Sequence, residues 1–162
     1  MINQAKILNS LSKNIYVKIP ITFTNGNYTS DVLKELVKLK IKLNITAIFT
    51  MNQIKTILPI VKNSGAILSV FAGRIFDCGE DANEIMKDIC NLVNKESNCK
   101  VLWASPRMAY DYINAINCGA KIITMQLSQI KKLKMFEKKL EDYSLDTVKQ
   151  FLKDANESGY KL

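Results

Sequence analysis

The chain has 162 residues, 48% of them hydrophobic and 23% charged, which is the balance of one globular domain rather than of a disordered protein. Apolar runs such as 66–72 are far too short to span a membrane, and residues 1–14 lack the apolar core of a signal peptide. The net charge of +8 comes from lysines spread along the whole chain, without an interleaved aromatic set, which favours a solvated surface over a nucleic-acid site.

The pattern predicts strands that alternate with helices. In the first half, the expected elements are a helix at 2–12, a strand at 15–22, a helix that Ser30 or Asp31 can cap, a strand at 43–49 and a helix at 51–61. In the second half, they are a strand at 66–71, a loop between Gly73 and Gly79, a helix at about 81–95, a strand at 100–104, a helix at about 107–117, a strand at 121–125 and helices near 126–134 and 145–158. Ser144 can cap the last helix, and Gly159 is expected to end it.

The expected strands are near-continuous apolar runs, which is typical of strands covered on both faces of a parallel sheet. The repeated strand–helix order indicates an α/β fold with five parallel βα units. From pattern alone, these units fit an open doubly wound sheet and part of a (β/α)8 barrel equally well. In both architectures, the active site lies at the carboxyl ends of the strands.

The four cysteines, Cys78, Cys90, Cys99 and Cys118, show no CxxC spacing, and the chain has no histidine to complete a set of metal ligands. We therefore expect reduced thiols in a cytoplasmic protein, and no metal site. The lack of histidine also excludes a Ser-His-Asp triad, so proton transfer must use another side chain or a held water. No obvious carboxylate follows a strand, and Asp77 looks like a loop residue.

The first two strands carry three polar candidates. Lys18 lies in the apolar run 15–21, where desolvation would favour the neutral, nucleophilic amine; the alternative is a lysine near a strand end that reaches water. Asn44 and Thr46 are two residues apart, so both side chains lie on one face of the next strand. Asn can hold a substrate hydroxyl and Thr a catalytic water, although both residues are also ordinary in a strand.

Two later strands each combine a serine with an arginine just beyond the strand. They are Ser69 with Arg74 in SVFAGR, and Ser105 with Arg107 in WASPR. These are the only two arginines among 23 basic residues, and a guanidinium can bind a phosphate through two hydrogen bonds, which lysine cannot copy. The pair predicts a phosphate clamp, with Gly73 expected to let the backbone turn before Arg74.

Four motifs together resemble the transaldolase family, in particular its short branch, which includes fructose-6-phosphate aldolase-like enzymes. They are VKIP at 17–20, NITAIF at 44–49, SVFAGRI at 69–75 and WASPR at 103–107, and residues 143–162 are similar to the C-terminal helix of that branch. The motifs stand in the family's order on successive strands. The resemblance implies a partial (β/α)8 barrel, in which the five units correspond to strands four to eight.

The resemblance also implies a role for each candidate residue. Lys18 matches the Schiff-base lysine, Asn44 the substrate-holding asparagine and Thr46 the threonine that holds the catalytic water. Phe71 matches the transaldolase branch, because the fructose-6-phosphate aldolase branch has Tyr there, and this favours group transfer modestly. The residues that match the binding of the substrate and its phosphate are Ser69, Arg74, Ser105 and Arg107.

The implied reaction moves a dihydroxyacetone unit from a ketose phosphate to an aldose phosphate, as in the pentose phosphate pathway. The lysine imine is the electron sink, so no metal or organic cofactor is expected, and neither nucleic acid nor membrane is an expected partner. Alternative interpretations are a fructose-6-phosphate aldolase-type lyase, a non-catalytic or truncated sugar-phosphate-binding remnant, and a basic nucleic-acid-binding domain.

The chain departs from the family pattern at its start. The family's first three βα units, which carry acid/base and hydroxyl-binding side chains, have no counterpart here. Five strands cannot close an eight-stranded barrel. We therefore expect residues 1–162 to form one domain that is the C-terminal part of a barrel, and to be completed by an N-terminal part or to form a homo-oligomer.

Overall fold

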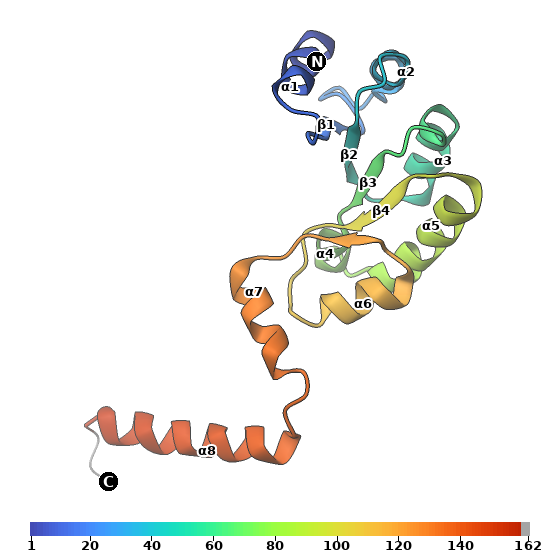
Figure 1. Cartoon of the computed structure of the whole chain (residues 1–162). Coiled ribbons are helices and arrows are strands. Elements are labelled where there is room, and N and C mark those ends of the chain that lie inside the picture. The colour runs from blue at the N-terminus through green and yellow to red at the C-terminus, as the bar shows by residue number, and fades with distance from the viewer. Residues whose placement is uncertain (160–162) are drawn as a thin grey trace. The chain divides into compact units, whose positions relative to one another are not determined.

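Five parallel strands form one sheet in the order of the sequence, β1-β2-β3-β4-β5 (Figure 1). This computed structural model describes residues 1–159. The strands are β1 (Val17–Pro20), β2 (Leu43–Ile48), β3 (Ile67–Val70), β4 (Lys100–Trp103) and β5 (Ile122–Ile123). Doubly wound sheets reverse their strand order at a switch point, whereas successive strands of a barrel are neighbours. The sequential order therefore favours the partial barrel over the doubly wound sheet.

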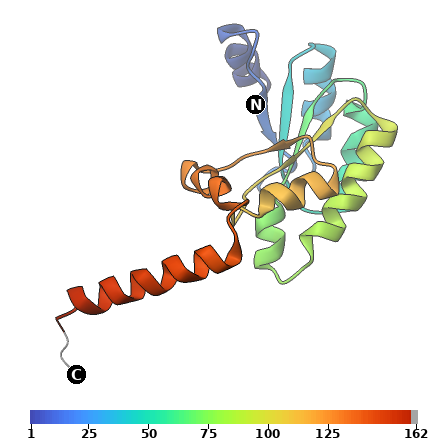
Figure 2. The ribbon, with the colours of Figure 1, turned by 60° about the horizontal axis from the view of Figure 1, so that its bottom comes forward.

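The sheet belongs to a first unit, residues 1–126, that also contains six helices. They are α1 (Ile2–Leu11), α2 (Ser30–Lys38), α3 (Met51–Val61), α4 (Ala72–Asp77), α5 (Ala82–Glu96) and α6 (Asp111–Cys118). Figure 2 shows α2, α3 and α5 on the same side of the strands. They bury apolar stripes there, such as Met86, Ile89 and Val93 of α5, because helical spacing brings these residues onto one face.

The two faces of the sheet differ in their side chains. The helix-covered face is fully apolar, and Ile45, Leu68 and Val101 in its centre are 0% exposed. The other face carries polar side chains, and β1 alternates between buried and exposed residues. The expectation of strands covered on both faces is therefore wrong at β1, because the helices that follow the strands cover only one face.

Several elements of the first unit differ from the sequence-based expectation, including β1, which spans Val17–Pro20 rather than 15–22. The expected loop between Gly73 and Gly79 contains the short helix α4, whose first turn is closed by N–H donors of Arg74 and Ile75 to the carbonyl of Phe71. α6 begins at Asp111 rather than near 107, because the Asp111 carboxylate binds two backbone N–H groups before the helix. β5 is only two residues long.

A second unit begins at Leu127 and is helical. It contains α7 (Leu127–Lys132), a 3-10 turn (Leu133–Met135) and α8 (Leu140–Glu157), none of whose side chains is buried. α8 begins five residues before the expected 145, so Ser144 lies inside it, and Gly159 beyond it has a φ of +71°, typical of a residue that ends a helix. Residues 160–162, the end of the motif at 143–162, lie outside the described residues. No helix within residues 1–159 is long and apolar enough to cross a membrane.

Candidate active site

Lys18, Asn44 and Thr46 come together on the open face of the sheet. Lys18 is the register partner of Asn44, and Pro20 is the partner of Thr46, so the three polar side chains point to the same side. Lys18 is exposed, whereas Asn44 and Thr46 are half-buried. The expectation that Lys18 lies in buried surroundings is therefore wrong for this chain, since β1 is buried only on its helix side.

A pocket of about 380 Å³ adjoins Lys18 on the side away from β2. It lies between α1 and β1, and its lining includes Gln4, Leu8 and Pro20. Lys18 therefore has Asn44 on one side, across the sheet, and this pocket on the other side, beside the first strand.

The amide of Asn44 is oriented by Ser69 of the next strand. Ser69 is 2% exposed, and its hydroxyl donates a hydrogen bond of 2.6 Å to Oδ1 of Asn44. Because the amide oxygen is occupied, the amide NH₂ group of Asn44 is the part left to donate to a ligand oxygen. Lys18, Asn44 and Ser69 thus form one polar row across β1, β2 and β3.

The carboxyl end of β2 contains a bulge that carries the chain to an aromatic pair. Ala47 has a φ of +60°, and the register of β2 with β3 shifts between Ile45 and Ile48. Just beyond it, the rings of Phe49 and Phe71 stack with centroids 5.8 Å apart. The guanidinium of Arg74 lies 5.1 Å from the ring centroid of Phe71, which gives a cation–π contact.

The loops after β3 and β4 touch directly at Gly73 and Ser105. A Cβ on Gly73 would lie 1.6 Å from the carbonyl oxygen of Ser105, so only glycine fits. The expected reason for this glycine was wrong: Gly73 lies inside α4 without a positive φ, and what it permits is a close backbone approach. Ser105 itself has a φ of +60°. This contact places α4, which carries Arg74, beside the loop that carries Arg107, as the clamp hypothesis requires.

Two carboxylates beside Arg107 were not recognised from the sequence. Asp77, which looked like a loop residue, ends α4 and forms an ion pair with the Arg107 guanidinium through both of its oxygens. Asp111 is 0% exposed, and its Oδ2 accepts hydrogen bonds from the backbone N–H groups of Arg107 (2.6 Å) and Met108 (3.1 Å). A carboxylate at the start of an apolar helical pattern, four residues after Arg107, was the available signal for Asp111.

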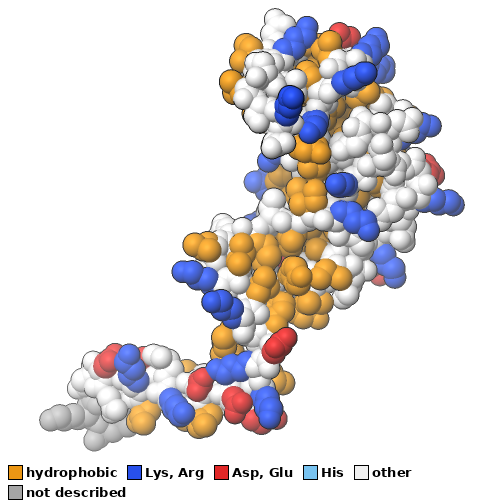
Figure 3. Space-filling model, in the orientation of Figure 1, with side chains coloured by type: hydrophobic (Ala, Val, Ile, Leu, Met, Phe, Trp, Pro, Cys, Tyr) orange, Lys and Arg blue, Asp and Glu red, His pale blue; other side chains and the backbone are white. Residues whose placement is uncertain are grey.

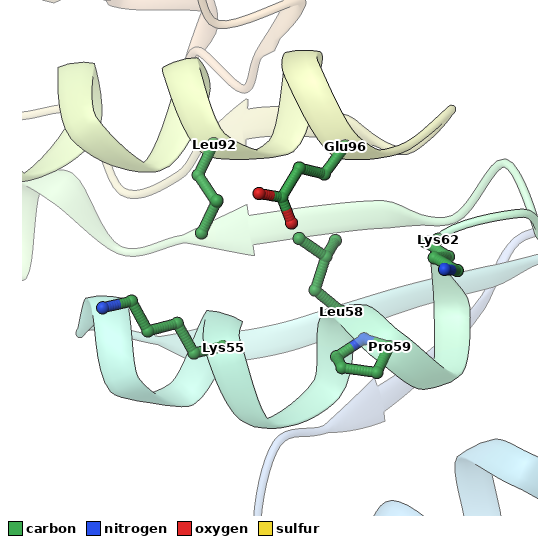
Figure 4. Close-up of a pocket in the computed structure, with 6 residues that line it drawn as sticks. All are labelled: Lys55, Leu58, Pro59, Lys62, Leu92 and Glu96. Atoms are coloured by element: carbon green, nitrogen blue, oxygen red, sulfur yellow. The ribbon is translucent and has the colours of Figure 1, made fainter.

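A second pocket lies on the helix layer between α3 and α5, with a volume of about 300 Å³ (Figure 4). Its lining residues are Lys55, Leu58, Pro59, Lys62, Leu92 and Glu96. Lys62 and Glu96 lie at the carboxyl ends of their helices, where β3 and β4 are about to begin, so this pocket is at the end opposite to the candidate site. Within residues 1–159, no group of three His, Cys, Asp or Glu residues could hold a metal ion.

Polar side chains at the carboxyl ends of sequential parallel strands are the arrangement of a barrel-type enzyme. A family model described as "Transaldolase/Fructose-6-phosphate aldolase" matches residues 1–162. The chain belongs to this family of transaldolase-type enzymes, which confirms the resemblance of its motifs.

Individual relatives agree with the family match. A "Probable transaldolase" of Thermoanaerobacter sp. (strain X514) is 31% identical over 163 residues, which cover 100% of this chain and 70% of that protein. A "Probable transaldolase" of Caldicellulosiruptor saccharolyticus is 32% identical over 156 residues, covering 95% of this chain and 66% of the relative. One from Methanococcus maripaludis is 30% identical over 155 residues, with the same coverage of 95% and 66%. These relatives are therefore longer than the chain.

Proposed function

We propose that this chain supplies the Schiff-base lysine of a transaldolase-type reaction on sugar phosphates. The observation that carries the proposal is the polar row of Lys18, Asn44 and Ser69, in a chain of the transaldolase/fructose-6-phosphate aldolase family. An amine beside an amide donor is the pair of groups needed to attack a ketone and to hold a neighbouring hydroxyl.

In the proposed mechanism, Nζ of Lys18 attacks the ketone carbon of a ketose phosphate, and loss of water gives a protonated imine. The imine accepts the electron pair of the C3–C4 bond as that bond breaks. The C4 hydroxyl gives its proton to a base from outside residues 1–162, and the aldose phosphate leaves. The three-carbon enamine then attacks an acceptor aldehyde, and water held by Thr46 hydrolyses the new imine. Phe71 favours this transfer over simple release of dihydroxyacetone.

Arg74 and Arg107 are proposed to bind the phosphate and so to orient the sugar along the sheet. They come from α4 and from the loop after β4, which meet at Gly73 and Ser105. Ser69 orients Asn44, and Ser105 is proposed to add a donor near the phosphate.

We further propose that the five βα units correspond to strands four to eight of a barrel, and that further strands and their acid/base side chains come from outside residues 1–162. The relatives' greater length and the open polar face of the sheet support this arrangement. The free edge of β1 is partly blunted, because Pro20 has no N–H group and its carbonyl accepts a 2.7 Å hydrogen bond from Thr29.

Borohydride trapping tests the proposal. Reduction in the presence of fructose 6-phosphate is expected to add mass to a peptide that contains Lys18, and Lys18→Ala is expected to abolish the adduct. Lys100→Ala is the matched control, because Lys100 is an exposed lysine that belongs to the same face three strands away. A folded, pure chain that gives no adduct at Lys18 would refute the proposed chemistry.

The second candidate function is a sugar-phosphate-binding remnant, which the exposure of Lys18 favours. It predicts phosphate binding that depends on Arg74 and Arg107 without any trapped adduct. A trapped adduct at Lys18 excludes it.

A further inference from the structure

Arg107 already has an anionic partner within the chain. Its Nε donates to Oδ1 of Asp77 at 3.2 Å, and its Nη2 donates to Oδ2 of the same carboxylate. This side-on pairing uses one edge of the guanidinium. The N–H groups of Nη1 and the second N–H of Nη2 remain for another acceptor.

The backbone of Arg107 and the first part of its side chain are also held. The backbone N–H donates to the buried carboxylate of Asp111 at 2.6 Å. The Cγ atom lies close to Gly73, 3.3 Å from the position that a Cβ on this glycine would take. Within residues 1–159, the guanidinium head group has Asp77 as its one hydrogen-bonding partner. The side chains of Arg107 and Asp77 are 46% and 50% exposed, so the pair is open to solvent and to a ligand.

We propose that Asp77 is a positioning residue, which holds the Arg107 guanidinium so that its free edge faces a substrate phosphate. This inference rests on the proposed function, because it assigns the anion to the phosphate of the sugar. A free arginine side chain loses considerable rotamer entropy when it binds, and a side chain that is already held loses less. Asp77 thereby tightens phosphate binding without touching the phosphate.

The competing outcome is that Asp77 blocks the site. A carboxylate that occupied the phosphate position would weaken binding, and its removal would strengthen it. The side-on geometry favours positioning, because the carboxylate leaves the end-on edge of the guanidinium unused.

A double-mutant cycle on the full chain, read by calorimetric titration with inorganic phosphate, tests the inference. Asp77→Ala is expected to weaken phosphate binding about 5- to 10-fold, the range expected for mobilising one long side chain. Asp77→Glu, which keeps the charge, is expected to restore most of the affinity. In an Arg107→Ala background, Asp77→Ala is expected to change binding less than about twofold, because it acts through Arg107.

Asp31→Ala is the matched control, because Asp31 is also an exposed carboxylate in an ion pair, with Lys34, and its loss changes the net charge equally. Unchanged or tighter phosphate binding by Asp77→Ala would overturn the inference, as would an equal loss in the Arg107→Ala background. Arg107→Lys serves as a second background that keeps the charge but not the fork.

The two proposals fail in different ways. Phosphate binding does not need Lys18, and trapping of unphosphorylated dihydroxyacetone at Lys18 does not need Asp77. If the double-mutant cycle gives the expected phosphate affinities but no adduct is trapped, the role of Asp77 is supported and the proposed Schiff-base reaction is refuted. If an adduct is trapped at Lys18 but phosphate affinity does not change in Asp77→Ala, the Schiff-base reaction is supported and the role of Asp77 is refuted.

Discussion

Gly73 and the Ser105 backbone lie so close that no side-chain atom fits between them. A Cβ on Gly73 would be 1.6 Å from the Ser105 carbonyl oxygen and 2.8 Å from its carbonyl carbon, both of them backbone atoms that cannot rotate away. We predict that Gly73→Ala destabilises the fold by about 2–4 kcal/mol, since the loop after β4 must move. Urea unfolding measures the change in the free energy of unfolding.

Gly79→Ala is the control for this prediction. Gly79 has a φ of +81°, but a Cβ at this position would meet no atom within 4 Å, so the change costs only conformational strain, about 1–2 kcal/mol. If Gly73→Ala costs no more than Gly79→Ala, the close contact does not hold the two loops together.

The buried cysteines predict an alkaline loss of stability. Burial raises the pKa of Cys90 from 9.0 to about 12, and the neighbouring Cys118 acts in the same direction. In the unfolded chain this thiol ionises first, so its contribution to stability is complete below pH 9 and is lost as the pH rises towards 12. Cys90→Ala is therefore expected to reduce the drop in unfolding free energy between pH 8 and pH 10.5 by about 2 kcal/mol.

Urea unfolding at both pH values measures this difference, and Cys78→Ala is the control because Cys78 is exposed. Each variant is compared with itself at the two pH values, so the pH-independent cost of the small cavity that the alanine leaves drops out of the difference. An unchanged pH dependence in Cys90→Ala would contradict the prediction.

At the scale of elements, Asp111 organises the connection from β4 to α6. Its carboxylate binds the N–H groups of Arg107 and Met108 and also accepts from the side chain of Asn114 at 3.2 Å. Asp111→Ala leaves two backbone N–H groups without this partner, so we predict a loss of about 2–3 kcal/mol and weaker phosphate binding. Asp88→Ala, at an exposed position in α5, is expected to change neither quantity appreciably, and thermal unfolding with phosphate titration measures both.

The strands and long helices were predictable because their signals are local. Helical spacing correctly predicted α3 at residues 51–61. The apolar run at 43–49 predicted β2, which ends one residue earlier, at Ile48. α4 was missed because Gly73 within it and Gly79 just after it favour a loop, whereas its first turn also bonds outside the helix, through the N–H of Gly73 to the carbonyl of Ala104. The start of α6 was missed for a similar reason. The carboxylate of Asp111 accepts hydrogen bonds from the backbone N–H groups of Arg107 and Met108, so the helix begins four residues later than expected.

The candidate site was predictable in its members but not in its connections. Even spacing put Asn44 and Thr46 on one face, and the register of β1 with β2 adds Lys18 to that face. The roles that the family resemblance implies for these residues remain predictions. The Ser69 to Asn44 hydrogen bond and the Asp77 to Arg107 pair depend on contacts between segments 25 and 30 residues apart, which no local pattern contains.

At the scale of the whole molecule, the strand order decided between two architectures that share the same local pattern. Continuous apolar strands predicted two covered faces, whereas the sheet has one apolar, helix-covered face and one face that carries polar side chains and is exposed at β1. Figure 3 shows hydrophobic side chains at the surface in the region of the sheet. Such exposed apolar groups are expected to pack against further chain.

We predict that self-association of the chain depends on the helix α8. Leu145, Val148 and Leu152 follow helical spacing and are 52%, 58% and 64% exposed. An unburied apolar stripe of this kind favours association, so we predict concentration-dependent oligomers in sedimentation analysis. Val148→Ser with Leu152→Ser is expected to shift the chain towards monomer, whereas Lys149→Gln on the same helix is not; a chain that stays monomeric at all concentrations contradicts this.

The open face beside Lys18 also bears on the fate of a bound intermediate. A transferase must keep its three-carbon adduct dry until an acceptor aldehyde arrives, because bulk water hydrolyses an exposed imine. Under the proposed mechanism, water would compete with the acceptor at every turnover on a sheet face without a cover. In the proposed mechanism, an uncovered adduct would release dihydroxyacetone as a free product, so the segment that covers this face would be the element that turns a lyase into a transferase.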